Sequence, residues 1–417
     1  MRLQNNQIQE VSRTLFVGST ILYLTTIHFS PSIASISSIL LILNAFYFFL
    51  FQNNSKLNKQ IQLVFFVSFG YAILSTILHG CNFASVIPKL LIRLPLVFLP
   101  SILGYVIHNK INLAKHWLFF SLPIFWLATT SVINYCVHYK FLSQMVLESK
   151  PVPIYSQVYH IEFSVIVAVV LLGLLIWKIQ GKIDELLGTH FFFYVIFGGL
   201  FIALHVLSAR TGILCFWIGL MVILSKRIKA IGAKYFIWGI LGISLLFFVP
   251  SVRNRIQNTK EDLTSVVEKK DLNHKSFGQR WEAWRAIVHA GSKSPWFGVG
   301  QCNIESSMQA SFEELHSELD QENRISPHNQ YLQWFIELGI VGLLIQLFQY
   351  ALLFRGMRKH GTQTMLWSVV LALVFSLNFE SLLERQSGVM IIIVSLLFVS
   401  HQLHEKESNN ERKHEIS

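Results

Sequence analysis

Apolar segments long enough to cross a bilayer recur along almost the whole of this 417-residue chain. A helix that crosses roughly 30 Å of hydrocarbon needs about 17–25 predominantly apolar residues. Twelve stretches of about this length lie near 14–29, 33–51, 61–79, 86–107, 117–138, 159–177, 190–207, 211–225, 235–250, 329–354, 365–380 and 388–404. The sequence therefore predicts an all-α polytopic membrane protein with about twelve transmembrane helices and one large, partly helical outer loop.

The composition agrees with this class and excludes several others. Apolar residues make up 53% of the chain and charged residues only 14%, whereas a soluble domain carries about 25% charged residues. Disordered and disulfide-scaffold classes do not fit such a composition. The net charge of +11 would suggest a nucleic-acid partner in a soluble protein, so the distribution of the cations decides its meaning.

The distribution of Lys and Arg predicts the orientation. With the N-terminus in the cytoplasm, 18 of these cations fall on the cytoplasmic side and 4 in the short outer loops. The positive-inside rule therefore places both termini in the cytoplasm and accounts for the net charge without nucleic acid. The span near 14–29 lacks a small-residue cleavage site, so we interpret it as a retained helix.

This topology divides the chain into four parts. Residues 1–250 hold spans one to nine, residues 251–328 form a large periplasmic loop, residues 329–404 hold spans ten to twelve, and residues 405–417 form a cytoplasmic tail. Within the loop, Ser276 and Gln279 have the spacing of a capping box ahead of an amphipathic helix. Gly291 suits the end of that helix.

The four cysteines indicate no particular chemistry. Cys81 and Cys136 fall near the outer face and could approach each other, while Cys302 is alone in the large loop. No Cys/His spacing typical of a metal site occurs, so we expect no metal.

His328 is the strongest candidate for a chemical role. Ser326 and Pro327 suit the cap and first position of a helix, which would place His328 in its first turn. There the helix field disfavours imidazolium, and a neutral imidazole can act as a general base. The alternative is an interfacial histidine that caps or snorkels. Glu337 lies deeper in the same span, where a hydrogen bond to another helix is the expected role.

Arginines provide the second set of candidates. Arg210 follows a tight turn at an outer span end, where it could bind a phosphate or a lipid headgroup. Arg280 and Arg285 flank two tryptophans in the large loop, which indicates either a surface for an anionic, sugar-bearing lipid or a helix resting on the membrane. Arg93 lies near the outer end of the fourth span. Arg385 lies in the last outer loop, beside two glutamates that an internal ion pair would explain.

All of these candidates lie on the same side of the membrane in this topology. They suggest an outward-facing site with one base and several cations, suited to a lipid-linked diphosphate.

At these residues the sequence resembles the O-antigen ligase and O-antigen polymerase superfamily of bacterial inner-membrane glycosyltransferases. The blocks that carry the resemblance are Ser208-Ala-Arg-Thr-Gly212, then Arg280-Trp-Glu-Ala-Trp284 with Pro295-Trp-Phe-Gly-Val-Gly300, and finally His328-Asn-Gln-Tyr-Leu332 with Glu337-Leu-Gly-Ile-Val-Gly342. The layout, with a large outer loop before the last spans, also fits.

The resemblance implies a metal-independent enzyme whose donor is a glycan on undecaprenyl diphosphate. By motif position His328 would be the catalytic base, and Arg210 and Arg280 would bind the diphosphate, whereas Arg285, Tyr331 and Arg385 receive no defined role. A ligase would use a lipid A-core acceptor, and the long loop favours this activity over an O-antigen polymerase. A related enzyme acting on protein hydroxyls is a further alternative. A flippase for lipid-linked sugars would be a different class, but the inverted repeats expected of one are not visible.

Overall fold

The computed structural model describes residues 2–52, 56–109, 111, 114–148, 150–181, 190–207, 209–227, 250–268, 272–359 and 366–398. Helices account for the regular structure of these residues, and no β-strand occurs among them. The predicted all-α class is therefore confirmed.

The long apolar helices follow the predicted spans. Six segments are long and apolar enough to cross a membrane. They belong to α2 (Pro31–Tyr47), α3 (Lys56–Leu78), α4 (Phe83–Val97) with α5 (Leu99–His108), α6 (Ala114–Val137), α8 (His160–Ile179) and α16 (Gln330–Lys359). Shorter apolar helices occupy four further predicted spans: α10 (His190–Val206), α11 (Arg210–Arg227), α17 (Leu366–Ser376) and Gln386–Phe398.

Two predicted spans remain. The helix α1 (Arg2–Thr26) covers the first but extends through the polar N-terminal stretch, and it is not among the six long apolar segments. The span near 235–250 lies almost entirely outside the described residues, as does the tail 405–417. The count of twelve spans stays a prediction.

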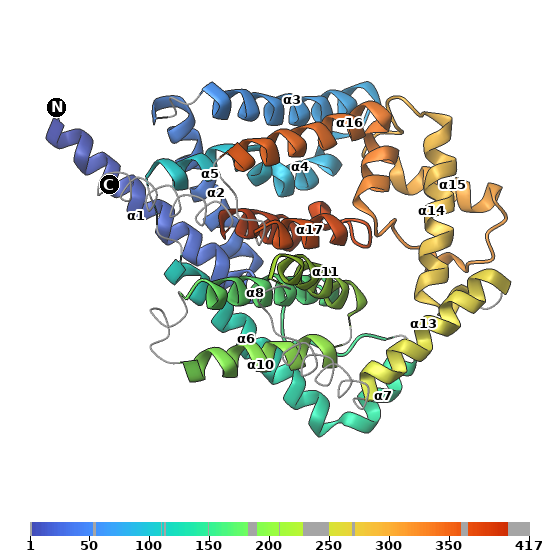
Figure 1. Ribbon diagram of the computed structural model, residues 1–417. Helices are drawn as coiled ribbons and strands as arrows, with labels where there is room; N and C mark the ends of the chain where they lie inside the picture. Colours follow the sequence, from blue (N-terminus) through green and yellow to red (C-terminus); the bar gives the residue numbers. More distant parts are fainter. Residues whose placement is uncertain are drawn as a thin grey trace.

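The apolar helices form a bundle in which α8 lies among α6, α10, α11 and α17 (Figure 1). The α8 helix is almost continuously apolar. In its most apolar stretch of 18 residues, 89% is buried inside the protein, against 67% or less in the corresponding stretches of the other long segments. It packs against α11 and α17, while α3 packs against α16. A helix that is apolar on all sides suits this central position.

A layer of more polar helices crosses one end of the bundle, opposite the end where α1 begins (Figure 1). It contains α13 (Pro250–Glu268), α14 (Ser276–Lys293) and α15 (Ile304–Glu314). The α14 helix buries Ala283, Ala286 and Ile287 against Phe312 of α15 and Ile336 of α16. The large loop predicted from the sequence is therefore folded around a small core that it shares with α16.

The predicted ends of α14 are wrong by one to two residues. Lys275 is the N-cap, so Ser276 is already helical, and the helix continues past Gly291 to Lys293. Gln279 donates instead to the backbone oxygen of Asn273 at 2.7 Å. A short 3-10 turn at Leu272–His274 lies directly before Lys275, and the helix starts one residue earlier than predicted.

The predicted span 86–107 is two helices, α4 and α5, that meet at Phe98. Pro100 has no backbone N–H and cannot continue the hydrogen-bond ladder. Gln62 of α3 bonds to the backbone on both sides of the break: it donates to the Val97 oxygen at 2.5 Å and accepts from the Ser101 N–H at 3.1 Å. The backbone groups released by the break are thereby satisfied inside an apolar bundle.

A backbone interlock joins the large loop to α16. Gly339 interrupts this helix with φ +68°, and the segment 295–300 fits against the kink. The N–H of Val299 donates to the Ile336 oxygen at 2.8 Å, and the N–H of Ile340 donates to the Pro295 oxygen at 2.8 Å. A Cβ on Gly298, at φ +73°, would lie 2.6 Å from the Glu337 backbone. The glycines of these two sequence blocks therefore permit one close backbone contact.

Replacing Gly298 with alanine should reduce the free energy of unfolding by about 2 kcal/mol or more, because it combines a left-handed backbone with a backbone clash. Thermal unfolding in detergent measures the change. Gly198→Ala is the matched control, since nothing lies within 4 Å of its Cβ, and it should leave stability unchanged or slightly higher. Equal stability of the two variants would contradict the interlock.

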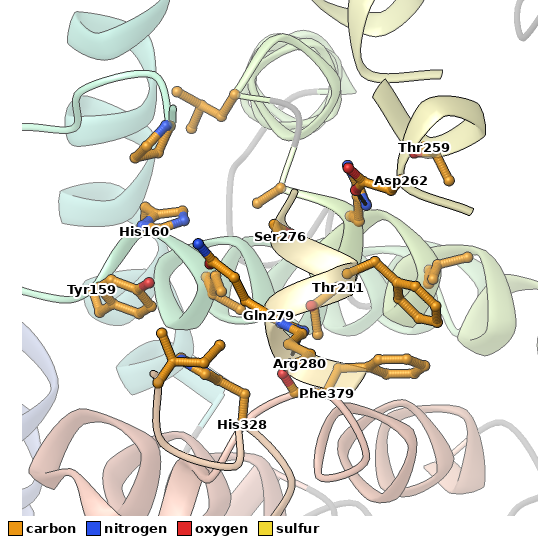
Figure 2. Close-up of a pocket in the computed structure, with 18 of the residues that line it drawn as sticks. Tyr159, His160, Thr211, Thr259, Asp262, Ser276, Gln279, Arg280, His328 and Phe379 are labelled. Carbon is orange, nitrogen blue, oxygen red and sulfur yellow. Dashed lines mark hydrogen bonds and ion pairs between the residues drawn. The ribbon is translucent and has the colours of Figure 1, made fainter. Parts of the chain in front are cut away.

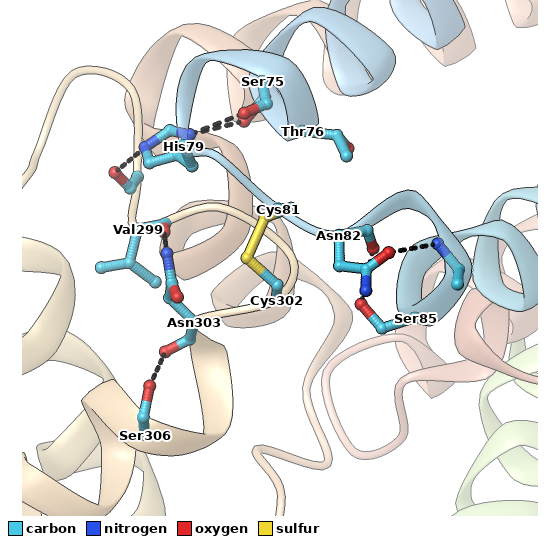
Figure 3. Close-up of a disulfide and its surroundings, with 12 residues drawn as sticks. Ser75, Thr76, His79, Cys81, Asn82, Ser85, Val299, Cys302, Asn303 and Ser306 are labelled. Carbon is cyan, nitrogen blue, oxygen red and sulfur yellow. Dashed lines mark hydrogen bonds between the residues drawn. A yellow bond between two sulfur atoms is a disulfide. The ribbon is translucent and has the colours of Figure 1, made fainter.

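A disulfide bond provides a second connection between the loop and the bundle. Cys81, before α4, is bonded to Cys302, 221 residues later. Nearby, His79 lies 3.1 Å from the backbone oxygen of Gly298 (Figure 3). The approach of Cys81 to Cys136 considered from the sequence is wrong, because Cys136 is free and exposed. The loop carries Cys302 back to the α3–α4 turn, a tertiary contact that spacing alone does not reveal.

Thiol titration checks this pairing. In denaturant without reductant, two thiols should react, those of Cys136 and Cys215, and all four should react after reduction. The Cys302→Ser variant should show a third reactive thiol without reductant, because it releases Cys81. Four reactive thiols in the unreduced protein would contradict the bond.

Candidate functional site

Residues from the three sequence blocks meet in one cavity at the boundary between the bundle and the polar layer. Its volume is about 390 Å³, and Arg210, Arg280 and His328 all line it. Figure 2 shows Arg280 and His328 converging from α14 and from the segment before α16, with Tyr159 and His160 at the start of α8. The structure thus brings together the three residues that the sequence analysis ranked highest.

His328 stands just outside α16. Its φ of +45° is uncommon for a residue other than glycine. The α16 helix begins at Gln330, and Asn329 caps it by accepting from the N–H groups of Tyr331 and Leu332 at 3.0 and 3.1 Å. The predicted first-turn position of His328 is therefore wrong, as are the predicted cap and first helical residue.

Hydrogen bonds from side chains to backbone oxygens hold the neighbours of His328. The Pro327 oxygen accepts from the indole N–H of Trp284 at 2.8 Å. The Asn329 amide donates to the Asn378 oxygen at 3.0 Å. Fixed on both sides, His328 keeps its unfavourable backbone angle, a type of local strain that occurs at functional sites.

Glu380 orients the imidazole of His328. Its two carboxylate oxygens lie 3.0 Å from Nδ1 of His328, and Glu380 is 2% exposed. Burial opposes ionisation of Glu380, but the hydrogen bond and charge of His328 and two nearby arginines hold its pKa below the usual value. An ionised carboxylate can only accept, so we assign the proton to Nδ1. In the neutral imidazole, Nε2 is then a proton acceptor.

The two arginines of the cavity differ in their partners. Arg210, the first residue of α11, donates to Asp262 of α13 at 2.8 Å, and the Asp262 side chain is fully buried. Arg280 donates to the backbone oxygen of Phe379 at 3.0 Å. Burial lowers the pKa of Arg280; the charges of Glu380 and Tyr159 oppose this shift, and the charge of Arg210 adds to it. An anion between the two guanidiniums would relieve both costs.

Unpartnered atoms in the cavity support this interpretation. Nη2 of Arg210 and Oδ1 of Asp262 are buried and have no hydrogen-bond partner within the described part of the chain. Buried polar atoms without partners are rare. Such atoms are expected where a ligand completes the site.

The five supporting candidates do not line this cavity. Arg93 is buried and forms ion pairs with Glu337 and Glu384, each at 2.6 Å. This pairing agrees with the structural role expected for Glu337. The other three, Arg285, Tyr331 and Arg385, donate to Glu282 at 2.7 Å, the Val374 oxygen at 3.2 Å and Glu162 at 3.3 Å respectively.

The expected ion pair within the last outer loop is replaced by pairs to other segments. Glu384 pairs with Arg93 and Arg385 pairs with Glu162, while Glu380 contacts His328. The sequence did not reveal the contact of Glu380 with His328. Sequence reasoning also missed Tyr159, His160 and Asp262, which line the cavity. The polar start of α8 gave a weak signal for the first two, but nothing distinguished Asp262 from the other acids of the loop. Among the described residues, no group of three His, Cys, Asp or Glu side chains could hold a metal ion.

These features define the class of the molecule: a multi-pass membrane protein with a cationic, histidine-containing cavity at one end of its helices. Residues 192–347 match the family model described as O-antigen ligase. The match supports placement of the chain in the O-antigen ligase superfamily and confirms the resemblance drawn from the motifs. The matched region contains all of the sequence blocks that carry the resemblance. The chain is also similar to an uncharacterized protein of Haemophilus influenzae, with 25% identity over 222 residues, which are 48% of this chain and 55% of that protein.

Proposed function

We propose that this protein transfers a glycan from undecaprenyl diphosphate to a sugar hydroxyl of lipid A-core at the periplasmic face of the inner membrane. The observation that carries the proposal is the cavity itself, where Arg210, Arg280 and His328 line one space. This chemistry requires a pair of cations that binds the diphosphate and an oriented proton acceptor for the hydroxyl.

In the proposed reaction, Nε2 of His328 accepts the proton of the acceptor hydroxyl. The acceptor oxygen attacks the anomeric carbon, and the bond from that carbon to the diphosphate oxygen breaks. The leaving undecaprenyl diphosphate keeps the electron pair, and Arg210 and Arg280 stabilise its growing negative charge. A single attack inverts the anomeric configuration. Because the guanidiniums supply the positive charge, we propose that the reaction needs no metal.

Two observations support a periplasmic position for the cavity. The Lys and Arg distribution supports an outer position for residues 251–328. The bond between Cys81 and Cys302 joins this segment to the α3–α4 turn, and disulfides persist in oxidising compartments such as the periplasm.

Deletion of the protein followed by gel analysis of lipopolysaccharide tests the proposal. Loss of all lipopolysaccharide that carries O-chains, with accumulation of lipid-linked polymer, is the result expected for a ligase. Core that carries one repeat unit would instead indicate an O-antigen polymerase. An unchanged ladder would contradict both activities, and accumulation of cytoplasmic-side lipid-linked units would indicate a flippase.

A further inference from the structure

A second cavity lies on the other side of the His328–Glu380 pair. Its volume is about 420 Å³, and Glu380 lines it, whereas His328 lines the first cavity. Ile325 borders both cavities, so the segment 325–328 forms part of the wall between them. The second cavity is also bordered by the loop that holds Gln301 and Cys302.

The charge of the second cavity differs from that of the first. The first contains two arginines and one aspartate. The second contains three cations and three carboxylates, namely Lys89, Arg324, Arg385, Glu305, Glu380 and Glu384. The first therefore suits an anion, whereas the second has no net formal charge and offers both donors and acceptors. Sugars present hydroxyl groups that require both.

Unpartnered buried groups indicate that the second cavity is built for a ligand. Gln301 is 4% exposed, and neither its Oε1 nor its Nε2 has a hydrogen-bond partner in the described part of the chain. The same holds for Oγ of Ser381. An amide buried without partners is costly, and a hydroxyl-rich ligand could satisfy both of its polar atoms.

Arg385 connects the two cavities. It lines the second, while its guanidinium lies 4.3 Å from the ring centroid of Tyr159, which lines the first. We propose that the second cavity binds a saccharide unit of the acceptor, adjoining the sugar whose hydroxyl reacts at His328. This inference rests on the proposed function, because it assigns the acceptor of that reaction.

The Gln301→Leu variant tests the inference. We expect its KM for lipid A-core to rise about tenfold, because the amide loses its hydrogen bonds to sugar. The donor KM and kcat should stay within about twofold of wild type. Ser381→Ala should shift the acceptor KM in the same direction. The thermal stability of Gln301→Leu should not fall, since this substitution removes buried polar atoms that form no hydrogen bond within the described part of the chain.

Gln257→Leu is the matched control, because Gln257 is exposed on α13 and should leave both KM values unchanged. An unchanged acceptor KM in Gln301→Leu, or a rise confined to the donor KM, would overturn the inference. A binding measurement tests the inference independently of the proposed function. Calorimetry measures how delipidated core oligosaccharide binds to the His328→Ala protein, and it needs no turnover. If the oligosaccharide binds and Gln301→Leu weakens this binding, the result supports the second cavity even if no transfer occurs. Absence of binding overturns the inference.

Discussion

Replacing His328 with alanine is expected to lower kcat for glycan transfer by about 10²–10⁴-fold, the usual contribution of a general base. The donor KM should change little, because the diphosphate is bound by the arginines and not by the imidazole. Initial rates with purified protein, a lipid-linked glycan donor and lipid A-core provide the measurement. A loss confined to KM would contradict the role of His328 as a base.

Glu380→Gln separates orientation from proton transfer. Glutamine keeps the shape of the side chain, but its amide can donate to Nδ1 and so favours the wrong tautomer of His328. We expect an intermediate loss of kcat, about 10–10²-fold, with an unchanged donor KM. Because the pKa of Glu380 is lowered in the folded protein, its carboxylate is ionised across the neutral range, and its stabilising effect is lost only as the pH falls through that lowered pKa. The wild type should therefore keep this contact throughout the neutral range.

Replacing Arg280 with alanine should lower kcat/KM for the donor by about 10²–10³-fold, because it removes a cation from the leaving diphosphate in a buried site. Arg280→Lys should recover only part of the activity, since an ammonium group cannot contact two phosphate oxygens in a fixed fork. Donor titrations at saturating acceptor measure both effects. An unchanged donor KM and kcat in Arg280→Ala would contradict the diphosphate assignment.

Arg285→Gln is the matched control, because Arg285 lies on the same helix and does not line the cavity, and a glutamine can still donate to the buried Glu282. Its donor kinetics should stay within about twofold of wild type. Arg210 is a less clean test. Removing it leaves the buried Asp262 without its ion-pair partner, so stability would fall together with activity. The double variant Arg210→Ala with Asp262→Asn would reduce this complication.

The sequence predicts the spans well where one physical property dominates. Long apolar runs indicate helices that cross a membrane, and the structure has helices in nearly every predicted span that it describes. The break at Phe98 was not predicted, because it depends on Gln62 from a neighbouring helix, which satisfies the interrupted backbone. The start of α16 was misplaced because Ser326 and Asn329 are both good caps, and only the tertiary contacts of Pro327 and Asn329 select the later one.

Part of the candidate site could be predicted, because some of its residues belong to recognisable motifs. His328, Arg210 and Arg280 stand in motifs, and their residue types limit the chemistry available to them. Glu380 and Gln301 could not be assigned, because their roles arise from which distant residues the fold places beside them. The pairing of Cys81 with Cys302 likewise depends on how the large loop returns to the bundle.

Turnover by the purified protein in liposomes tests the central claim most directly. Wild-type protein supplied with undecaprenyl-diphosphate glycan and lipid A-core, in the presence of a metal chelator, should form core-linked glycan and release one undecaprenyl diphosphate for each product. His328→Ala should bind the donor but form almost no product. Equal product from His328→Ala and the wild type would contradict the account.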